Sequence, residues 1–121
     1  MGIVPFRKLL ARYPELPAIV AHMGALEYGA FGELLAHHPG IFLDTAFAFL
    51  PGLGAVCDLG AEFLEKHRER IIYGSDFPNI IFPREDEIDT LLGLNLSQAF
   101  YDSVFRDNGL RLIGETGQTR P

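Results

Sequence analysis

The stretch Arg70-Ile-Ile-Tyr-Gly-Ser-Asp-Phe-Pro78 decides the fold, because it reads as a short buried strand that stops at an acid. The β-formers Ile71-Ile-Tyr73 show no alternation with polar residues, which is typical of a strand covered on both faces. The small pair Gly74-Ser75 lets another group approach closely. Asp76 lies where the strand ends, and Pro78 cannot continue a ladder. Chemistry in parallel α/β proteins takes place at this strand edge, so Asp76 is either a ligand or a cap.

Helical and strand patterns alternate on both sides of this stretch. Helices are predicted over 5–13, 28–38, 55–68, from Glu85-Asp86-Glu87 onward, and over 98–108; strands are predicted over 18–22, 41–45 and 71–75. The expected buried faces include Val56 in the third helix, and Ile88, Leu91 and Leu92 in the fourth. Ser97 is expected to cap the last helix and Gly109 to end it. Short apolar strands separated by helices predict an α/β fold with a parallel sheet, here of only three strands with two open edges.

Composition bounds the class of protein. The chain has 121 residues, of which 48% are hydrophobic and 21% charged, as in one globular domain. A net charge of −6 argues against a nucleic-acid partner. The single cysteine, Cys57, excludes an internal disulfide, suits a reducing compartment and is interpreted as a small hydrophobe. Apolar runs fall short of the roughly 20 residues that a membrane span needs. We therefore expect a cytoplasmic protein without membrane or nucleic-acid partners.

Polar groups end all three predicted strands: His22, then Asp44-Thr45, then Asp76. Parallel strands bring these ends to one edge, where imidazole and carboxylate could bind a zinc-like cation or act as acid and base. Each residue also has a structural interpretation. Asp44 would bond nearby backbone amides, His22 would be a satisfied structural histidine, and Asp76 would serve a turn or cap.

Four segments carry a family resemblance. Tyr13-Pro-Glu-Leu-Pro-Ala-Ile-Val-Ala-His-Met-Gly24 and Ile71-Ile-Tyr-Gly-Ser-Asp-Phe-Pro78 resemble segments of amidohydrolase family 2. This family contains metal-dependent hydrolases and aminocarboxymuconate-semialdehyde decarboxylase-like enzymes. Ile41-Phe-Leu-Asp-Thr45 resembles the strand between them, and Phe105-Arg-Asp-Asn-Gly-Leu-Arg-Leu-Ile-Gly114 is similar to the closing helix. The resemblance spans nearly the whole chain, which we treat as one partial domain, residues 1–121.

The resemblance implies strands six to eight of a (β/α)8 TIM barrel, which is the C-terminal part of such an enzyme. It implies that Asp76 binds a divalent metal, expected to be Zn²⁺, and orients or deprotonates the attacking water. It implies that His22 contacts the substrate or acts as acid/base, and that it is a metal ligand in two-metal members. Asp44 is not carried over as catalytic.

The resemblance also shows which parts of the family pattern this chain lacks. The family's His-x-His pair and its strand-five histidine have no counterpart. The remaining histidines, His37, His38 and His67, lie near predicted helix ends and are interpreted as solvated or capping groups. Catalytic zinc wants three protein ligands, and a whole barrel needs about 250 residues. The metal site is therefore expected to be incomplete in this chain.

Three hypotheses follow. The first is a fragment of a metal-dependent enzyme that hydrolyses or non-oxidatively decarboxylates a small carboxylic acid or lactone, with the missing part of the barrel as partner. There the loop 77–84 would shape the pocket, and Arg84 could contact a carboxylate, although a solvated Arg84 is the plainer interpretation. The second is a non-catalytic module that assembles through its open sheet edges, with itself or another chain. The third, a receiver-like phosphoacceptor, fails because that fold has five strands and no lysine follows a strand here.

Overall fold

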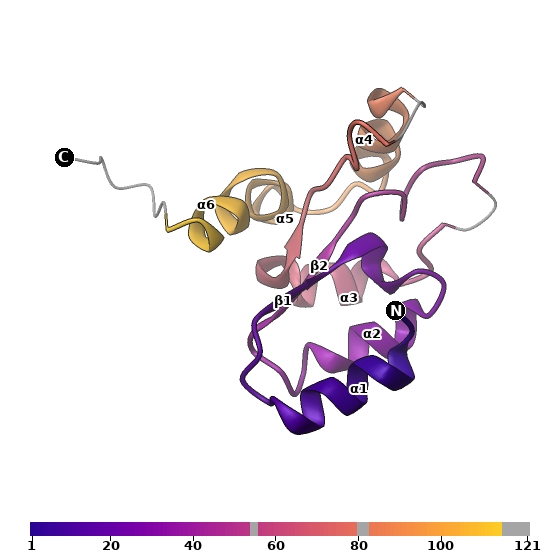
Figure 1. Ribbon diagram of the computed structural model, residues 1–121. Coiled ribbons are helices and arrows are strands. Elements are labelled where there is room, and N and C mark those ends of the chain that lie inside the picture. The colour runs from indigo at the N-terminus through magenta and orange to yellow at the C-terminus, as the bar shows by residue number, and fades with distance from the viewer. Residues whose placement is uncertain (54–55, 80–82, 115–121) are drawn as a thin grey trace.

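The computed structural model describes residues 1–53, 56–79 and 83–114 of the chain. Its elements are α1 (Ile3–Arg12), β1 (Ala18–Val20), η1 (Ala21–Gly24), α2 (Tyr28–Leu34), β2 (Ile41–Asp44), α3 (Ala61–Lys66), η2 (Arg68–Arg70), β3 (Ile71–Ile72), α4 (Arg84–Gly93), α5 (Gln98–Asp102), the π-helical turn η3 (Ser103–Asp107) and α6 (Asn108–Leu112) (Figure 1). No helix in this described part is long and apolar enough to cross a membrane.

The three strands form one parallel sheet in the order β1-β2-β3, which confirms the predicted α/β architecture. Ile19 pairs with Phe42, and Leu43 pairs with Ile71. Figure 1 shows α1, α2 and α3 gathered on one side of the strands. Helices α1 and α2 are in contact through the rings of Phe6 and Phe31, which are tilted by 45° with their centroids 5.6 Å apart.

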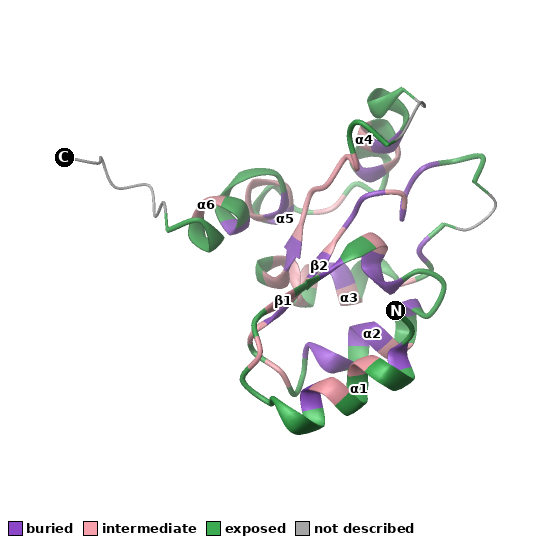
Figure 2. Cartoon of the chain, in the orientation of Figure 1, coloured by how far each residue is buried: buried purple, intermediate pink, exposed green. Residues whose placement is uncertain are grey.

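Only one face of the sheet is covered. Val20, Leu43 and Ile71 are buried, whereas Ile19 is 53% exposed and Phe42 is half-buried (Figure 2). Strand residues alternate between the two faces, so the second face lies open along β1 and β2. The expectation that Ile71-Ile-Tyr73 is covered on both faces is met only in part, because Ile71 is buried whereas Ile72 and Tyr73 are half-buried.

All three strands are shorter than predicted, because the backbone changes partners at their carboxyl ends. After Ile72, the Tyr73 amide donates to the Val104 carbonyl in η3, and the Gly74 amide donates to Thr45 Oγ1. β1 stops at Val20, and the next residues enter the turn η1. The predicted ends 22, 45 and 75 thus lie in loops beyond the sheet.

The third predicted helix, 55–68, is much shorter than expected. Its first residue lies outside the described part of the chain, and α3 begins only at Ala61. Val56 is exposed, and the Cys57 amide donates to the Ala48 carbonyl, which ties this segment to the preceding loop. Cys57 is buried, as a small hydrophobe should be.

The C-terminal helix runs past Gly109, so the prediction that this glycine ends it is wrong. The buried Asn108 side chain donates to the carbonyls of Arg68 and Ile71, at 2.6 Å each, and this anchors α6 to the start of β3. The helix ends instead before Gly114, which adopts a φ of +84°. Ser97 caps α5 as predicted, since its side chain accepts from the Phe100 amide.

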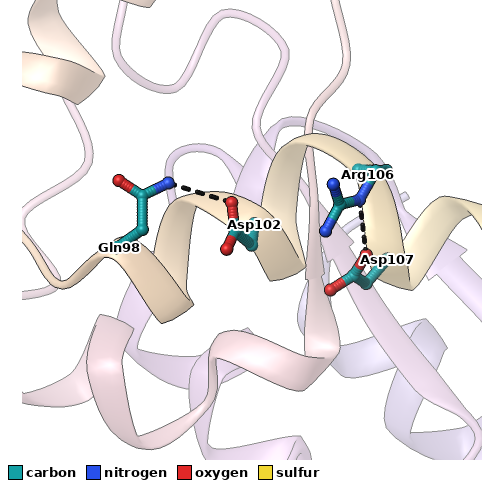
Figure 3. A network of polar contacts seen from close by, with 4 residues as sticks. All are labelled: Gln98, Asp102, Arg106 and Asp107. Atoms are coloured by element: carbon teal, nitrogen blue, oxygen red, sulfur yellow. Dashed lines mark hydrogen bonds and ion pairs between the residues drawn. The ribbon is translucent and has the colours of Figure 1, made fainter.

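The outer surface of this helix carries short-range polar pairs. Gln98 donates to Asp102 at 2.9 Å, and Arg106 lies 2.7 Å from Asp107 (Figure 3). The Arg106 side chain is 65% exposed, so this is a solvated face.

Candidate functional site

Asp76 lies in the turn that follows β3, at the carboxyl edge of the sheet. Its backbone has a φ of +53°, and its carbonyl accepts from the Asn79 amide at 2.8 Å. Its carboxylate is half-buried, and Asn79 Nδ2 approaches Oδ1 to only 3.5 Å, which is long for a hydrogen bond. Helix α4 begins at Arg84 behind Pro83, so Asp76 caps no helix of the described chain. The turn therefore presents a carboxylate with spare acceptor capacity.

His22 lies in η1, directly after β1, with a φ of +59°. Its Nδ1 lies 2.9 Å from the Ala46 carbonyl, and its ring packs edge-on against Phe47. A carbonyl oxygen only accepts, so Nδ1 carries the hydrogen. In the neutral ring this leaves the lone pair on Nε2, which can take up a proton or bind an electrophile.

Asp44 fulfils the structural role predicted for it. Its Oδ1 accepts from the Ala46 amide at 2.7 Å. The carboxylate packs against Gly74, where an added Cβ would come within 2.5 Å of Oδ1. Gly74 thus leaves room for the Asp44 carboxylate, which agrees with the expectation that Gly74 lets another group approach closely.

Glu87 is a buried acid that the sequence did not predict. The sequence grouped it with Glu85 and Asp86 as acids of a helix N-terminus, yet Glu87 is only 3% exposed, whereas the other two are exposed. Burial raises the pKa of its carboxyl to about 7; the backbone amides of Phe49 and Phe47 lower it, and the charge of Asp44 raises it further. The signal was Leu91, buried four residues later on the same helix face.

The buried face of α4 differs from its prediction in one further respect. Leu91 is fully buried and Ile88 partly buried, but Leu92 is 47% exposed. The buried face of α4 therefore includes Glu87, whereas the prediction placed Leu92 on it.

The remaining candidates lie outside this cluster. Arg84 is exposed and stacks over the Phe77 ring at 5.1 Å. His37 is exposed and His38 half-buried in the turns after α2. His67 ends α3 and packs on Phe63, and burial lowers its pKa, as do Lys66 and Arg70. The exposed His37 agrees with its interpretation as a solvated group and His67 stands at the C-cap of α3, whereas the half-buried His38 fits neither interpretation clearly.

His22 and Asp44 both bond to the backbone of Ala46, so the structure brings these two predicted residues together. The charges of Asp44 and His22 both act on the Glu87 carboxyl. Asp76 stands at the same sheet edge, with no hydrogen bond to this group among the described residues. Within residues 1–53, 56–79 and 83–114, no three His, Cys, Asp or Glu side chains come together as a metal site.

The sequence model of the amidohydrolase family matches residues 2–114. The chain belongs to the amidohydrolase family. Among curated proteins, no relative matches it.

A solved structure with a similar fold is a TIM barrel. The uncharacterized TIM-barrel protein Bb4693 from Bordetella bronchiseptica superposes with a TM-score of 0.72 at 15% sequence identity. The match covers 93% of this chain and 39% of that one, so this amidohydrolase chain spans well under half of the barrel protein it matches. The sheet and helices described above correspond to part of a TIM barrel.

Proposed function

We propose that the chain supplies the last three βα units, strands six to eight, of a (β/α)8 amidohydrolase. The enzyme would hydrolyse or non-oxidatively decarboxylate a small carboxylic acid or lactone. Asp76 is the proposed ligand of a divalent metal, Zn²⁺, and the proposed base or orienting group for water. His22 is the proposed acid/base or substrate contact. The proposed relationship is closest to the aminocarboxymuconate-semialdehyde decarboxylase-like enzymes, and the proposed location is cytoplasmic.

The observation that carries this proposal is the position of Asp76 in an amidohydrolase-family chain. Its carboxylate follows the last strand and caps no described helix, and among the described residues it meets only the distant Asn79 amide. Polar groups at the carboxyl ends of barrel strands are where TIM-barrel enzymes do their chemistry. A ligand is therefore favoured over a cap for Asp76.

The orientation of His22 supports its proposed role. The Ala46 carbonyl holds Nδ1–H, so Nε2 is the nitrogen available to a reacting group. Because the second nitrogen is fixed by hydrogen bonding, the ring keeps one tautomer and one direction while Nε2 gains or loses a proton.

The described residues do not by themselves fit a metal. Catalytic zinc takes about three protein ligands, and no cluster of three potential ligands exists in the described part of the chain. Asp76 would be one ligand, and the others must come from elsewhere in a completed barrel.

Two hollows mark where the rest of the barrel would pack. One of about 260 Å³ borders His22 and the outer edge of β1, including Ile19 and Val20. Another of about 500 Å³ lies against Ile19, Phe42 and Ile113. Both lie along the open edge or the open face of the sheet, which a closed barrel covers with further strands and core side chains.

The test compares the 121-residue chain alone with the chain joined to a segment that completes the barrel. Metal content is measured by mass spectrometry, and activity is assayed against panels of lactones and small carboxylic acids. The completed protein is expected to bind metal, and Asp76→Ala is expected to reduce both metal content and turnover by at least about 100-fold. Asp89→Ala, at an exposed site on α4, is the matched control.

Two outcomes would contradict the proposal. If the completed protein binds no metal and Asp76→Ala changes nothing, the enzyme assignment is wrong. If the chain alone binds stoichiometric metal, the conclusion that its ligand set is incomplete is wrong.

A non-catalytic module is the second candidate, because Ile19 on β1 is 53% exposed at an open edge. Such a module would assemble through that edge without metal. Sedimentation analysis separates the two: a module self-associates at micromolar concentration, and its association does not depend on Asp76.

A further inference from the structure

Phe47 has a backbone conformation that bulky residues rarely adopt. Its φ is +65°, in the left-handed region, and its side chain is half-buried in the loop after β2. A residue with a Cβ is strained there whereas glycine is not, so a phenylalanine at this place is an outlier. Strain of this kind persists where the surrounding structure holds it, and it gathers at functional sites. The ring of Phe47 therefore supplies something that a glycine would lack.

The ring of Phe47 packs on the imidazole of His22. The two ring centroids lie 4.9 Å apart with an interplanar angle of 65°, which is an edge-to-face arrangement. Aromatic rings favour this geometry, because the positive edge of one ring meets the negative face of the other. The contact joins the loop after β2 to the turn η1 that follows β1.

The residue before Phe47 holds the same imidazole through a hydrogen bond. The Ala46 carbonyl lies 2.9 Å from His22 Nδ1, and this carbonyl belongs to the peptide unit that ends at the Phe47 nitrogen. The φ of Phe47 sets how its side chain lies relative to that peptide unit, and at the left-handed value carbonyl and ring both meet His22. Ala46 is itself fixed, since its amide donates to Asp44 Oδ1 at 2.7 Å.

We propose that Phe47 is a positioning residue: its ring, packed on the imidazole beside the Ala46 hydrogen bond, keeps His22 in one orientation and one tautomer. Nε2 then faces a reacting group in a fixed direction. Without the ring, the His22 side chain can rotate away from the Ala46 carbonyl and exchange between tautomers. The catalytic meaning of this orientation rests on the proposed function; the packing itself does not.

Long-range ¹H–¹⁵N NMR of the 121-residue chain measures the His22 tautomers at alkaline pH, where an ordinary imidazole is neutral. His22 signals are assigned with His22→Gln. The decisive variant is Phe47→Gly, because glycine accepts the left-handed backbone and only the ring is lost. It is expected to lower the ratio of Nδ1–H to Nε2–H by about fivefold, the factor that one aromatic pair supplies. Phe47→Tyr keeps the ring and should keep the wild-type ratio.

Phe63→Ala is the matched control. Phe63 is also half-buried and packs on a histidine, His67, with the ring centroids 4.5 Å apart, so this variant loses a similar contact elsewhere in the chain. It should leave the His22 tautomer ratio unchanged. A general loosening of the fold would instead lower the ratio in both variants, and equal falls overturn the proposal.

A folded Phe47→Gly variant with the wild-type tautomer ratio also overturns the proposal, as does a wild-type chain that holds both tautomers in comparable amounts. If Phe47→Gly does not fold, Phe47→Leu decides by the same ratio, because leucine keeps apolar volume without a flat ring. Absence of metal binding or activity in the completed barrel would instead contradict the proposed function and leave these spectra unchanged.

Discussion

At the scale of single residues, the acids at the carboxyl edge of the sheet differ in how many of their oxygens already accept a hydrogen bond. One oxygen of Asp44 accepts from the Ala46 amide, whereas the Asp76 carboxylate meets, in the part of the chain that the structure describes, only Asn79 at 3.5 Å. Two acids at corresponding strand ends therefore differ in the hydrogen bonds that they accept. The difference follows from the loops after each strand, since the chain after Asp44 turns back under its own carboxylate.

Gly74 gives the first prediction. A Cβ at this position would lie 2.5 Å from Asp44 Oδ1, so Gly74→Ala must displace the Asp44 carboxylate and break its bond to Ala46. We expect a loss of about 1–3 kcal/mol in unfolding free energy by urea titration. In the double variant Gly74→Ala/Asp44→Ala the clash is gone. Its loss in unfolding free energy should therefore be smaller than the sum of the losses in the two single variants. Additive losses would contradict this packing.

Glu87 gives a pH-dependence. Its folded pKa is raised from 4.5 to about 7, so between these values the folded state binds more protons than the unfolded state. Its contribution to stability is complete below pH 4.5 and falls as the pH rises to about 7, by about 3 kcal/mol. Urea titrations of wild type and Glu87→Gln at several pH values measure this. The difference in unfolding free energy between the two proteins should change with pH by the full amount given above. A constant difference would show that Glu87 ionises normally.

At the scale of elements, a side chain from a distant segment can donate hydrogen bonds to backbone carbonyls at the end of a helix or the start of a strand. Arg70, at the end of η2, donates to the carbonyls of Ile41 and His38, so it closes the end of the α2–β2 connection. Arg70 therefore serves the connection that lies beside it in space, and burial lowers its pKa.

Arg70→Met tests this at the element scale. The variant keeps much of the aliphatic stem but loses the guanidinium donors, so buried carbonyls lose their partners and we expect a loss of about 2–3 kcal/mol in unfolding free energy. Arg106→Met is the matched control. Its partner Asp107 is also on the surface (Figure 3), so its loss should stay within about 0.5 kcal/mol. Equal losses in the two variants would contradict the role given to Arg70.

At the scale of the whole molecule, the sheet has one covered and one open face. Parallel sheets are normally buried on both faces, and the TIM-barrel protein that this chain resembles is more than twice as long, since the match covers 39% of it. The open face is the side that would line a barrel interior. The chain therefore has the outer packing of a barrel segment without its inner packing.

Ile19 and Val20 test this asymmetry. Ile19 is 53% exposed, so Ile19→Asp should change the stability of the chain alone by no more than about 0.5 kcal/mol. Val20 is buried, so Val20→Asp should cost about 3 kcal/mol or more. In a completed barrel both variants should be strongly destabilised in thermal unfolding. A tolerated Ile19→Asp in the completed protein would contradict a barrel-interior location.

The sequence by itself determined the α/β class, the parallel three-stranded sheet, the amidohydrolase resemblance and the structural role of Asp44, because these follow from local periodicity and short motifs. Only the tertiary structure decided where the strands end, how far the last helix runs and that Glu87 is buried. Val104 takes the Tyr73 amide, and Asn108 holds α6 past Gly109. Each depends on a contact between segments far apart in the chain, which no local pattern encodes.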